Sequence, residues 1–378
     1  MSFASALTSR AADPVLPQIA GDMDVSLRTA TLVATTFAIP YAVVQPVLGV
    51  LADMFGKARL LVICLGVLVS AAALCAVAPS FEILIVGRIL FGCGAGGTFP
   101  IVLAMVGDSV PVNQRQVAIA RVLGASMSAI VLGAVGAGIV GDYFGWRMVF
   151  LLNGVLCGIA LTIALFEFRA RPIPPGPRRS LKETLGSYKT LFRHPLAVVC
   201  FGAVMVEGFM VQGFFPYVSI LLQQQGEPRA SIAGLVLAGW GIGGFFYSIV
   251  IARLLRHVSE RMLMIIGGAV SAGVYITMSF GPPWQVALAV FILLGLSFYL
   301  LHAFIQLYVT ELAPEARASA LSMHSFFFFA GQACGPVGYG FGFSHFGVQP
   351  TLLIAAASLF AIAVWCALKF RRDEQPAL

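Results

Sequence analysis

Four ionisable side chains, Arg10, Asp13, Arg88 and Glu207, lie within long apolar stretches of this 378-residue chain. A charge at the depth of a membrane's hydrocarbon core is costly, and such residues either pair with one another or serve ion and proton movement. Asp13 or Glu207 is therefore a candidate proton-carrying acid, and Arg10 and Arg88 could adjust its protonation. The other interpretation is a permanently ionised quartet in which two positive and two negative groups neutralise one another.

Two histidines in apolar stretches, His302 and His324, could also carry protons, because imidazole titrates near neutral pH. A hydrogen bond to a neighbouring helix is the other interpretation of each histidine. Polar and aromatic side chains that could line a substrate cavity, about half of which we expect to serve packing instead, are Tyr41, Gln45, Gln212, Tyr217, Trp240, Gln306 and Gln332.

No catalytic constellation accompanies these groups. The sequence has no phosphate-binding Walker loop and no metal-ligand spacing, and its seven cysteines form no CxxC pair. We therefore predict that the protein is not an enzyme, that it uses no metal or cofactor, and that an ion gradient supplies its energy.

The elements that position these residues are predicted to be membrane helices. Hydrophobic residues make up 59% of the chain and charged residues only 10%, whereas soluble domains carry about 25% charged residues. The apolar runs are roughly 20 residues long, which is the length that crosses the hydrocarbon core as a helix. The sequence predicts twelve spans: 3–20, 29–52, 59–79, 82–108, 116–141, 147–168, 196–223, 230–255, 261–281, 284–310, 318–343 and 348–370. Arg10 and Asp13 interrupt the first run, so we do not expect it to be a cleaved signal peptide.

The chain repeats itself, since Gly133, Gly136 and Gly138 recur 202 residues later as Gly335, Gly338 and Gly340. Self-similarity at a fixed period indicates one structural unit used twice. Six spans per unit is an even number, so the units are parallel repeats that meet at a central interface. We predict an all-α membrane protein with an N-terminal bundle over 1–168, a cytoplasmic linker over 169–195, and a C-terminal bundle with a short tail over 196–378.

Lys and Arg set the predicted orientation. With both termini in the cytoplasm, eighteen of the 23 Lys and Arg residues lie on the inner side and three on the outer side. The net charge of +7 reflects this bias, so nucleic-acid binding is not needed to explain it. Within the linker, apolar residues at helical spacing among basic ones predict an amphipathic helix on the membrane surface, although a plain linker with one helical turn fits nearly as well.

The loop between the second and third spans reads Gly49-Val-Leu-Ala-Asp53-Met54-Phe-Gly56-Lys57-Ala58-Arg59. It resembles the signature G-x-x-x-D-R/K-x-G-R/K-R/K of the major facilitator superfamily, and Met54 and Ala58 depart from it. The resemblance implies a cytoplasmic gate in which Asp53 bonds a neighbouring helix end. Acidic and basic residues at the inner ends of later spans are its expected partners: Asp108, Arg115, Glu311 and Arg317.

Three further motifs resemble efflux members of that family. Arg88 begins an R-x-x-x-G-x-G pattern that is linked to proton movement in proton-coupled members, although a structural ion pair is the alternative. Asp13 begins D-P-x-x-P. Gly133 begins a pattern that has Ala134 where efflux members carry proline, and its repeat copy keeps Gly335-Pro336.

The resemblance implies alternating-access transport, with proton-coupled efflux of a small organic molecule or drug as the expected function. The alternatives are uptake of a metabolite (a sugar, organic acid or amino acid), whether proton-coupled or facilitative, and a non-transporting membrane sensor. The expected partners are the substrate, protons and lipid, and the expected state is a monomer in a bacterial inner membrane.

Overall fold

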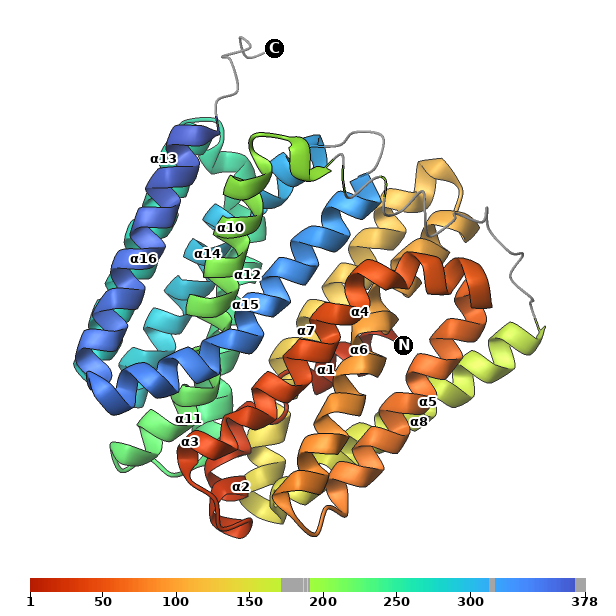
Figure 1. Ribbon diagram of the computed structural model, residues 1–378, viewed down its shortest axis with the longest axis horizontal. Coiled ribbons are helices and arrows are strands. Elements are labelled where there is room, and N and C mark those ends of the chain that lie inside the picture. The colour runs from red at the N-terminus through yellow and green to blue at the C-terminus, as the bar shows by residue number, and fades with distance from the viewer. Residues whose placement is uncertain (171–185, 187–188, 190, 313–316, 371–378) are drawn as a thin grey trace.

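The described part of the chain is helical throughout. In the computed structural model the described residues are 1–170, 186, 189, 191–312 and 317–370, and they contain no β-strand. Segments from the first half and from the second half form two groups of helices side by side (Figure 1).

The first half opens with a broken segment and continues with five long helices. The broken segment comprises α1 (Ser2–Thr8), the 3-10 turn η1 (Asp13–Val15) and α2 (Leu16–Asp22), and the short α3 (Leu27–Ala30) follows it. The long helices are α4 (Leu32–Phe55), α5 (Lys57–Ala76), α6 (Phe81–Ser109), α7 (Val112–Phe144) and α8 (Trp146–Ala170).

The second half begins with an interrupted helix that corresponds to the broken segment of the first half. It comprises α10 (Ala197–Glu207), the π-helix η2 (Gly208–Gln212) and α11 (Phe215–Gln224). Five long helices follow: α12 (Ala230–Leu254), α13 (Glu260–Ser279), α14 (Trp284–Leu312), α15 (Arg317–His345) and α16 (Val348–Lys369).

Ten of these helical segments are long and apolar enough to cross a membrane. The first and eleventh predicted spans, 3–20 and 318–343, are not among the ten. The first is divided at residues 9–12, because Pro14 and Pro17 each lack the N–H that a continuous helix requires there. The eleventh corresponds to the continuous α15, whose sequence is rich in glycine and polar residues.

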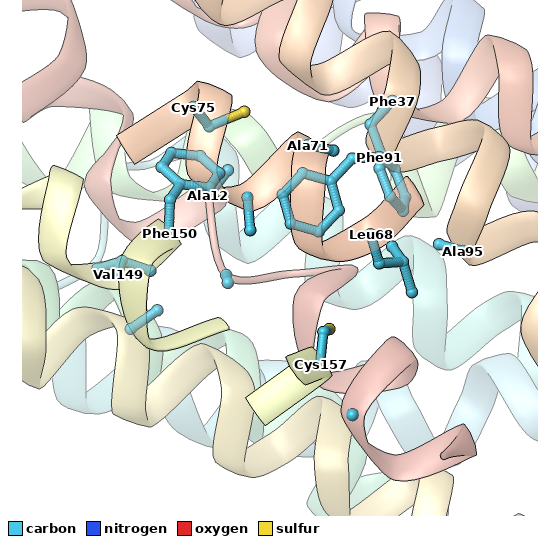
Figure 2. Packing of buried hydrophobic residues seen from close by; sticks show 14 of the residues in the cluster. Ala12, Phe37, Leu68, Ala71, Cys75, Phe91, Ala95, Val149, Phe150 and Cys157 are labelled. Atoms are coloured by element: carbon cyan, nitrogen blue, oxygen red, sulfur yellow. The ribbon is translucent and has the colours of Figure 1, made fainter. Parts of the chain in front are cut away.

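The buried apolar core of the first half contains closely packed aromatic and sulfur-containing side chains. Figure 2 shows Phe37, Phe91 and Phe150 in this cluster together with Leu68 and Cys75. Two further apolar clusters lie mainly within the second half. These cores hold α5, α6 and α8 together on one side, and α13, α14 and α16 on the other.

The two halves meet along two helix pairs, α7 with α12 and α4 with α15. The bundle has one end that carries Lys57, Ala170 and Lys369, here called the Lys57 end, and an opposite end that carries Asp22, Gly145 and Gly226, here called the Gly145 end. The amphipathic helix predicted within the linker, from 181 to 193, is described only at residues 186, 189 and 191–193, which are helical.

Candidate functional site

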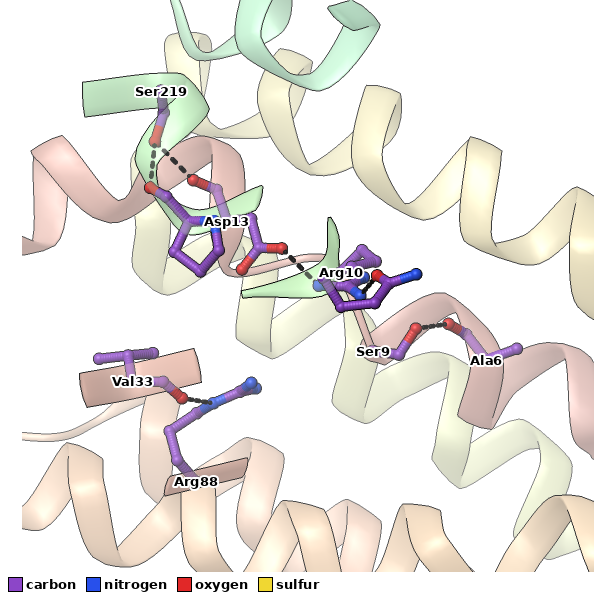
Figure 3. Close-up of polar contacts among 9 residues, drawn as sticks. Ala6, Ser9, Arg10, Asp13, Val33, Arg88 and Ser219 are labelled. Atoms are coloured by element: carbon purple, nitrogen blue, oxygen red, sulfur yellow. Dashed lines mark hydrogen bonds and ion pairs between the residues drawn. The ribbon is translucent and has the colours of Figure 1, made fainter. Parts of the chain in front are cut away.

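Arg10 and Asp13 form an ion pair at the break in the first segment. Arg10 Nη1 lies 3.2 Å from Asp13 Oδ2, and the side chains are only 9% and 4% exposed. The unwound stretch between α1 and η1 carries Arg10, and its guanidinium lies between Asp13 and the second half (Figure 3). There it donates to Gln212 Oε1 and stands 4.6 Å from the centroid of the Phe215 ring.

The contact between Arg10 and Gln212 joins equivalent positions of the repeat, because the two residues are 202 apart. In a molecule with two-fold pseudo-symmetry, equivalent residues touch only beside the axis. Ser219 adds a second connection between the same segments by donating its hydroxyl to the backbone oxygen of Asp13 at 2.8 Å (Figure 3). The breaks in the two segments therefore lie together at the centre of the molecule.

Arg88 occupies a separate buried site within the first half. Its side chain is 1% exposed, and its Nε donates to the backbone oxygen of Val33 at 3.0 Å (Figure 3). The guanidinium carbon stands 4.6 Å from the ring centroid of Phe37, and the rings of Phe91 and Phe150 are also within 6 Å. Nη1 has no hydrogen-bond partner among the described residues. Ring faces therefore supply much of the stabilisation that this cation receives.

Glu207 forms the centre of a second buried cluster, in the second half. Its residue exposure is 1%, and Oε2 lies 2.9 Å from Nδ1 of His302. His302 in turn contacts the ring of His324 at a centroid distance of 4.9 Å. Glu207 Oε1 and His324 Nε2 have no hydrogen-bond partner among the described residues. The cluster thus keeps unused polar atoms at both of its ends.

Aromatic side chains and an irregular helix hold this cluster in place. Phe298 stacks on His302 at 4.7 Å with an interplanar angle of 20°, and Phe328 lies 5.2 Å from the same ring. Glu207 ends α10 and the π-helix η2 begins directly after it. Such π-helical turns occur frequently at functional sites because they alter the direction of neighbouring side chains.

The two predicted intramembrane acids thus occur in two different settings. Asp13 has an arginine as its partner, whereas the described partner of Glu207 is a histidine, which is charged only when it holds an extra proton. A carboxyl and an imidazole at this distance titrate as one coupled unit and can share a proton. Glu207 with His302 and His324 is therefore the arrangement best suited to accept and release protons.

Several of the predicted cavity residues make hydrogen bonds that join helices. Gln45 donates to the backbone oxygen of Gly96 at 3.2 Å, Tyr217 donates to that of Pro336 at 2.8 Å, and Gln212 accepts from Arg10. These three side chains already serve the structure.

The other four predicted cavity residues differ among themselves. Tyr41 packs on Phe329 across the two halves at 4.0 Å, and Gln306 is exposed. Trp240 Nε1 and Gln332 Oε1 are buried and have no hydrogen-bond partner among the described residues. These last two therefore retain unused hydrogen-bonding capacity in the second half.

The predicted gate loop is described only in part. Gly49 and Asp53 fall within α4, Gly56 adopts a φ of 81° between α4 and α5, and Lys57 begins α5. This left-handed conformation explains the glycine, because other residues adopt it at a cost. Arg59, Glu311 and Arg317 are exposed. The side chains of Asp53, Asp108 and Arg115 lie outside the described residues.

Sequence reasoning did not single out Ser219 or the acids at the Gly145 end. Asp22 accepts hydrogen bonds from Trp146 and Arg147, and Asp142 bonds the start of α12. Their only sequence signal was an acid close to the end of a predicted span, which does not name a partner more than 80 residues away.

Comparison with known proteins gives a consistent result. The family model described as Major Facilitator Superfamily matches residues 1–318 and 228–378. An uncharacterized MFS-type transporter, YtbD of Bacillus subtilis, is 26% identical over 388 residues, covering 100% of this chain and 96% of that protein. The multidrug export protein EmrB of Haemophilus influenzae is 30% identical over 168 residues, which cover 44% of this chain and 32% of EmrB.

Among solved structures, the crystal structure of a D-xylose–proton symporter superposes on this chain with a TM-score of 0.75. The match covers 98% of this chain and 96% of the symporter at 13% sequence identity. At this level of identity the likeness concerns the fold.

Proposed function

The chain belongs to the Major Facilitator Superfamily, and from this premise we propose that it exports a small organic molecule or drug in exchange for protons. Family membership and the apolar helices make it a multi-pass membrane transporter and not an enzyme. In the proposed cycle, the two halves rock about the central contact between the broken segments and expose the interior to each side in turn.

The observation that carries the proton-coupled part of the proposal is the cluster of Glu207, His302 and His324. An ionised carboxylate in so buried a site costs several kcal/mol unless a cation compensates it. The described partner of Glu207 is an imidazole that becomes a cation only by binding a proton itself. The cluster is therefore most stable with a bound proton while it is closed off, and it can release that proton when the halves open it to water.

Asp13 has a different role in this proposal. Arg10 compensates its charge at 3.2 Å, so Asp13 can remain ionised throughout a transport cycle. We assign the Arg10–Asp13 pair to holding the broken first segment against the second half, and the exchange of protons to Glu207.

Two observations support export as the direction of transport. The first-half motif that begins at Gly133 and continues to Gly145-Trp146-Arg147 resembles that of efflux members. A relative with 30% identity over 168 residues is described as a multidrug export protein. Ala134, at the position where efflux members carry proline, favours the alternative of metabolite uptake, which the first experiment below also tests.

The proposed setting is the inner membrane of a bacterium, with the Lys57 end in the cytoplasm. The span assignment from the sequence gives eighteen of the 23 Lys and Arg residues to that side, and cytoplasmic loops carry such an excess. The proposed functional unit is the monomer, because each chain supplies both halves of the central contact.

The test begins with a thermal-shift screen of compound classes on the purified protein, followed by transport of the best compound in proteoliposomes with an imposed proton gradient. We expect the gradient to drive the compound against its concentration in the antiport direction. Symport in the same assay would establish uptake instead.

Two acid-to-amide variants then locate the proton site. Glu207→Gln should keep exchange of substrate at equilibrium and lose the response to the gradient, whereas Asp13→Asn should keep the response. Glu82→Gln, which alters an exposed acid at the start of α6, is the matched control. A Glu207→Gln variant that still responds to the gradient would refute the assignment.

A further inference from the structure

A carboxylate from the first half caps a helix of the second half at the Gly145 end. Asp142, near the end of α7, accepts a hydrogen bond from the backbone N–H of Ala230 at 2.7 Å through Oδ1. Its Oδ2 accepts another from the N–H of Ser231 at 2.9 Å. Ala230 and Ser231 are the first residues of α12, and the N-cap residue of that helix, Arg229, contributes no capping side chain.

This arrangement stabilises α12 in the way that an N-terminal cap does. The first N–H groups of a helix have no partner within it, and the helix dipole favours a negative charge at that end. An acidic N-cap normally comes from the helix's own sequence. Here it comes from the opposite half, so the cap exists only while the two halves are in contact.

Beneath the cap, α7 and α12 approach each other through small residues spaced four apart in each helix, namely Ala134 and Gly138 in α7 and Ala230 and Gly234 in α12. Gly138 packs against Ala230 and Ser231, and a Cβ at Gly138 would stand 2.8 Å from the Cα of Ser231. Gly234 packs against Ala134, and its Cβ would stand 3.0 Å from the backbone carbon of Ala134. Such small residues allow helix backbones in a membrane to touch. The crossing therefore holds Asp142 within reach of the start of α12.

The equivalent crossing on the other side of the molecule lacks this contact. The repeat places Arg28 opposite Ser344 there, and Arg28 Nη1 donates to the Ser344 hydroxyl at 3.4 Å. In this long contact the Ser344 hydroxyl carries no charge, and the Arg28 side chain is exposed to water. Leu32 takes the position that corresponds to Gly234. The Gly145 end is therefore joined by a charged cap on the α7–α12 side. On the α4–α15 side the contacts of the described residues contain no carboxylate: besides Arg28 with Ser344, Thr31 contacts the Tyr217 hydroxyl at 3.4 Å and Thr35 donates to the backbone oxygen of Ala333 at 3.0 Å.

We propose that Asp142 is a latch that holds the two halves together at the Gly145 end, and that its contact with the start of α12 must break each time this end opens. The inference rests on the proposed alternating-access function. It states that Asp142 controls the fraction of molecules that are open at this end. Because the side chain of Asp142 is exposed, water can replace its hydrogen bonds when the halves separate.

The test measures the distance between the halves directly. Spin labels are attached at Glu82→Cys in the first half and Gln224→Cys in the second, both exposed positions near the Gly145 end, with Cys93 and Cys334 replaced by serine. Pulsed electron resonance in detergent, without substrate or gradient, gives the ratio of separated to closed molecules. Asp142→Asn keeps one acceptor oxygen but loses the negative charge and one of the two hydrogen bonds, so it should raise this ratio about five-fold, which corresponds to about 1 kcal/mol.

The matched control is Glu227→Gln. It removes an acid three residues before α12, but that acid pairs with Arg229 of its own half at 2.6 Å, so the ratio should stay within about two-fold of the parent. An Asp142→Asn ratio within that range, an equal shift in Glu227→Gln, or no separated population in any variant would overturn the latch. Since no gradient is used, a parent protein without proton-coupled transport in the proteoliposome assay would refute the proposed function without affecting this result.

Discussion

The ion pair between Arg10 and Asp13 predicts a strong energetic coupling between the two residues. Arg10→Met leaves the Asp13 carboxylate without a cation in a site where its side chain is 4% exposed, and breaking a buried pair in this way costs about 3–5 kcal/mol. Asp13→Asn leaves Arg10 with Gln212 and the Phe215 ring, so its cost should be smaller, about 1–3 kcal/mol. The double variant contains no uncompensated charge, and it should cost at least about 2 kcal/mol less than the sum of the single changes.

The four proteins of this cycle are compared by unfolding with sodium dodecyl sulfate in mixed micelles, followed by far-ultraviolet circular dichroism. The exposed pair of Glu227 and Arg229 provides a second cycle in the same protein. Its Arg229 and Glu227 side chains are 59% and 17% exposed, so its coupling should stay below about 1 kcal/mol. If the costs of Arg10→Met and Asp13→Asn simply add, the pair does not support the broken segment, and the structural role assigned to Asp13 is wrong.

Three other outcomes follow from single sites. A hydrogen bond from Arg147 holds the pKa of Asp22 below its ordinary value of 3.8, so the stabilisation it provides is complete above that value and is lost as the pH falls through the lower, folded-state pKa. Thermal unfolding of the parent and Asp22→Asn should therefore differ at pH 6 and converge as the pH falls below 3.8. Gly234→Ala should lower the unfolding temperature in detergent, because its Cβ meets the backbone of Ala134, whereas Gly158→Ala, with open space around it, should leave that temperature unchanged or raise it. Arg88→Lys should cost about 1–3 kcal/mol of unfolding free energy, since a lysine loses the planar contact with Phe37; an unchanged unfolding curve would contradict the role of the rings.

The fold was predictable because the rules behind it act along the sequence. Span length follows from the thickness of the hydrocarbon core, and the parallel arrangement follows from an even number of spans per repeat. Interruptions were harder to predict. Pro14 and Pro17 indicated the break in the first segment, but nothing in Gly208–Gln212 distinguishes a π-helix from an α-helix. Hydrogen-bond register within a helix depends on tertiary contacts, in this case the close approach of α15 at Gly208 and Gly213.

The buried charges were predictable from the sequence, but the partner of Glu207 was not. The cost of intramembrane charge identified Arg10, Asp13, Arg88 and Glu207. Their total charge suggested that these four could neutralise one another. In the structure Asp13 pairs with Arg10, whereas Glu207 pairs with His302, which is 95 residues away. Partners this far apart in the sequence are determined by how the helices pack. The composition of helices with similar hydrophobicity does not specify that packing.

The divergence between the repeats connects the cluster of Glu207, His302 and His324 with the contact between the halves. At equivalent positions the first half has Arg10 and the second has Gln212, and these two residues bond to each other beside the pseudo-symmetry axis. Gln212 is the last residue of η2, and Glu207 immediately precedes that element. A single five-residue π-helix therefore lies between the carboxyl group of the cluster and the side chain that receives Arg10. Any movement of η2 must alter both contacts. Identical halves, with the same residue at both positions, could not link the Glu207 cluster to the junction between the halves in this way.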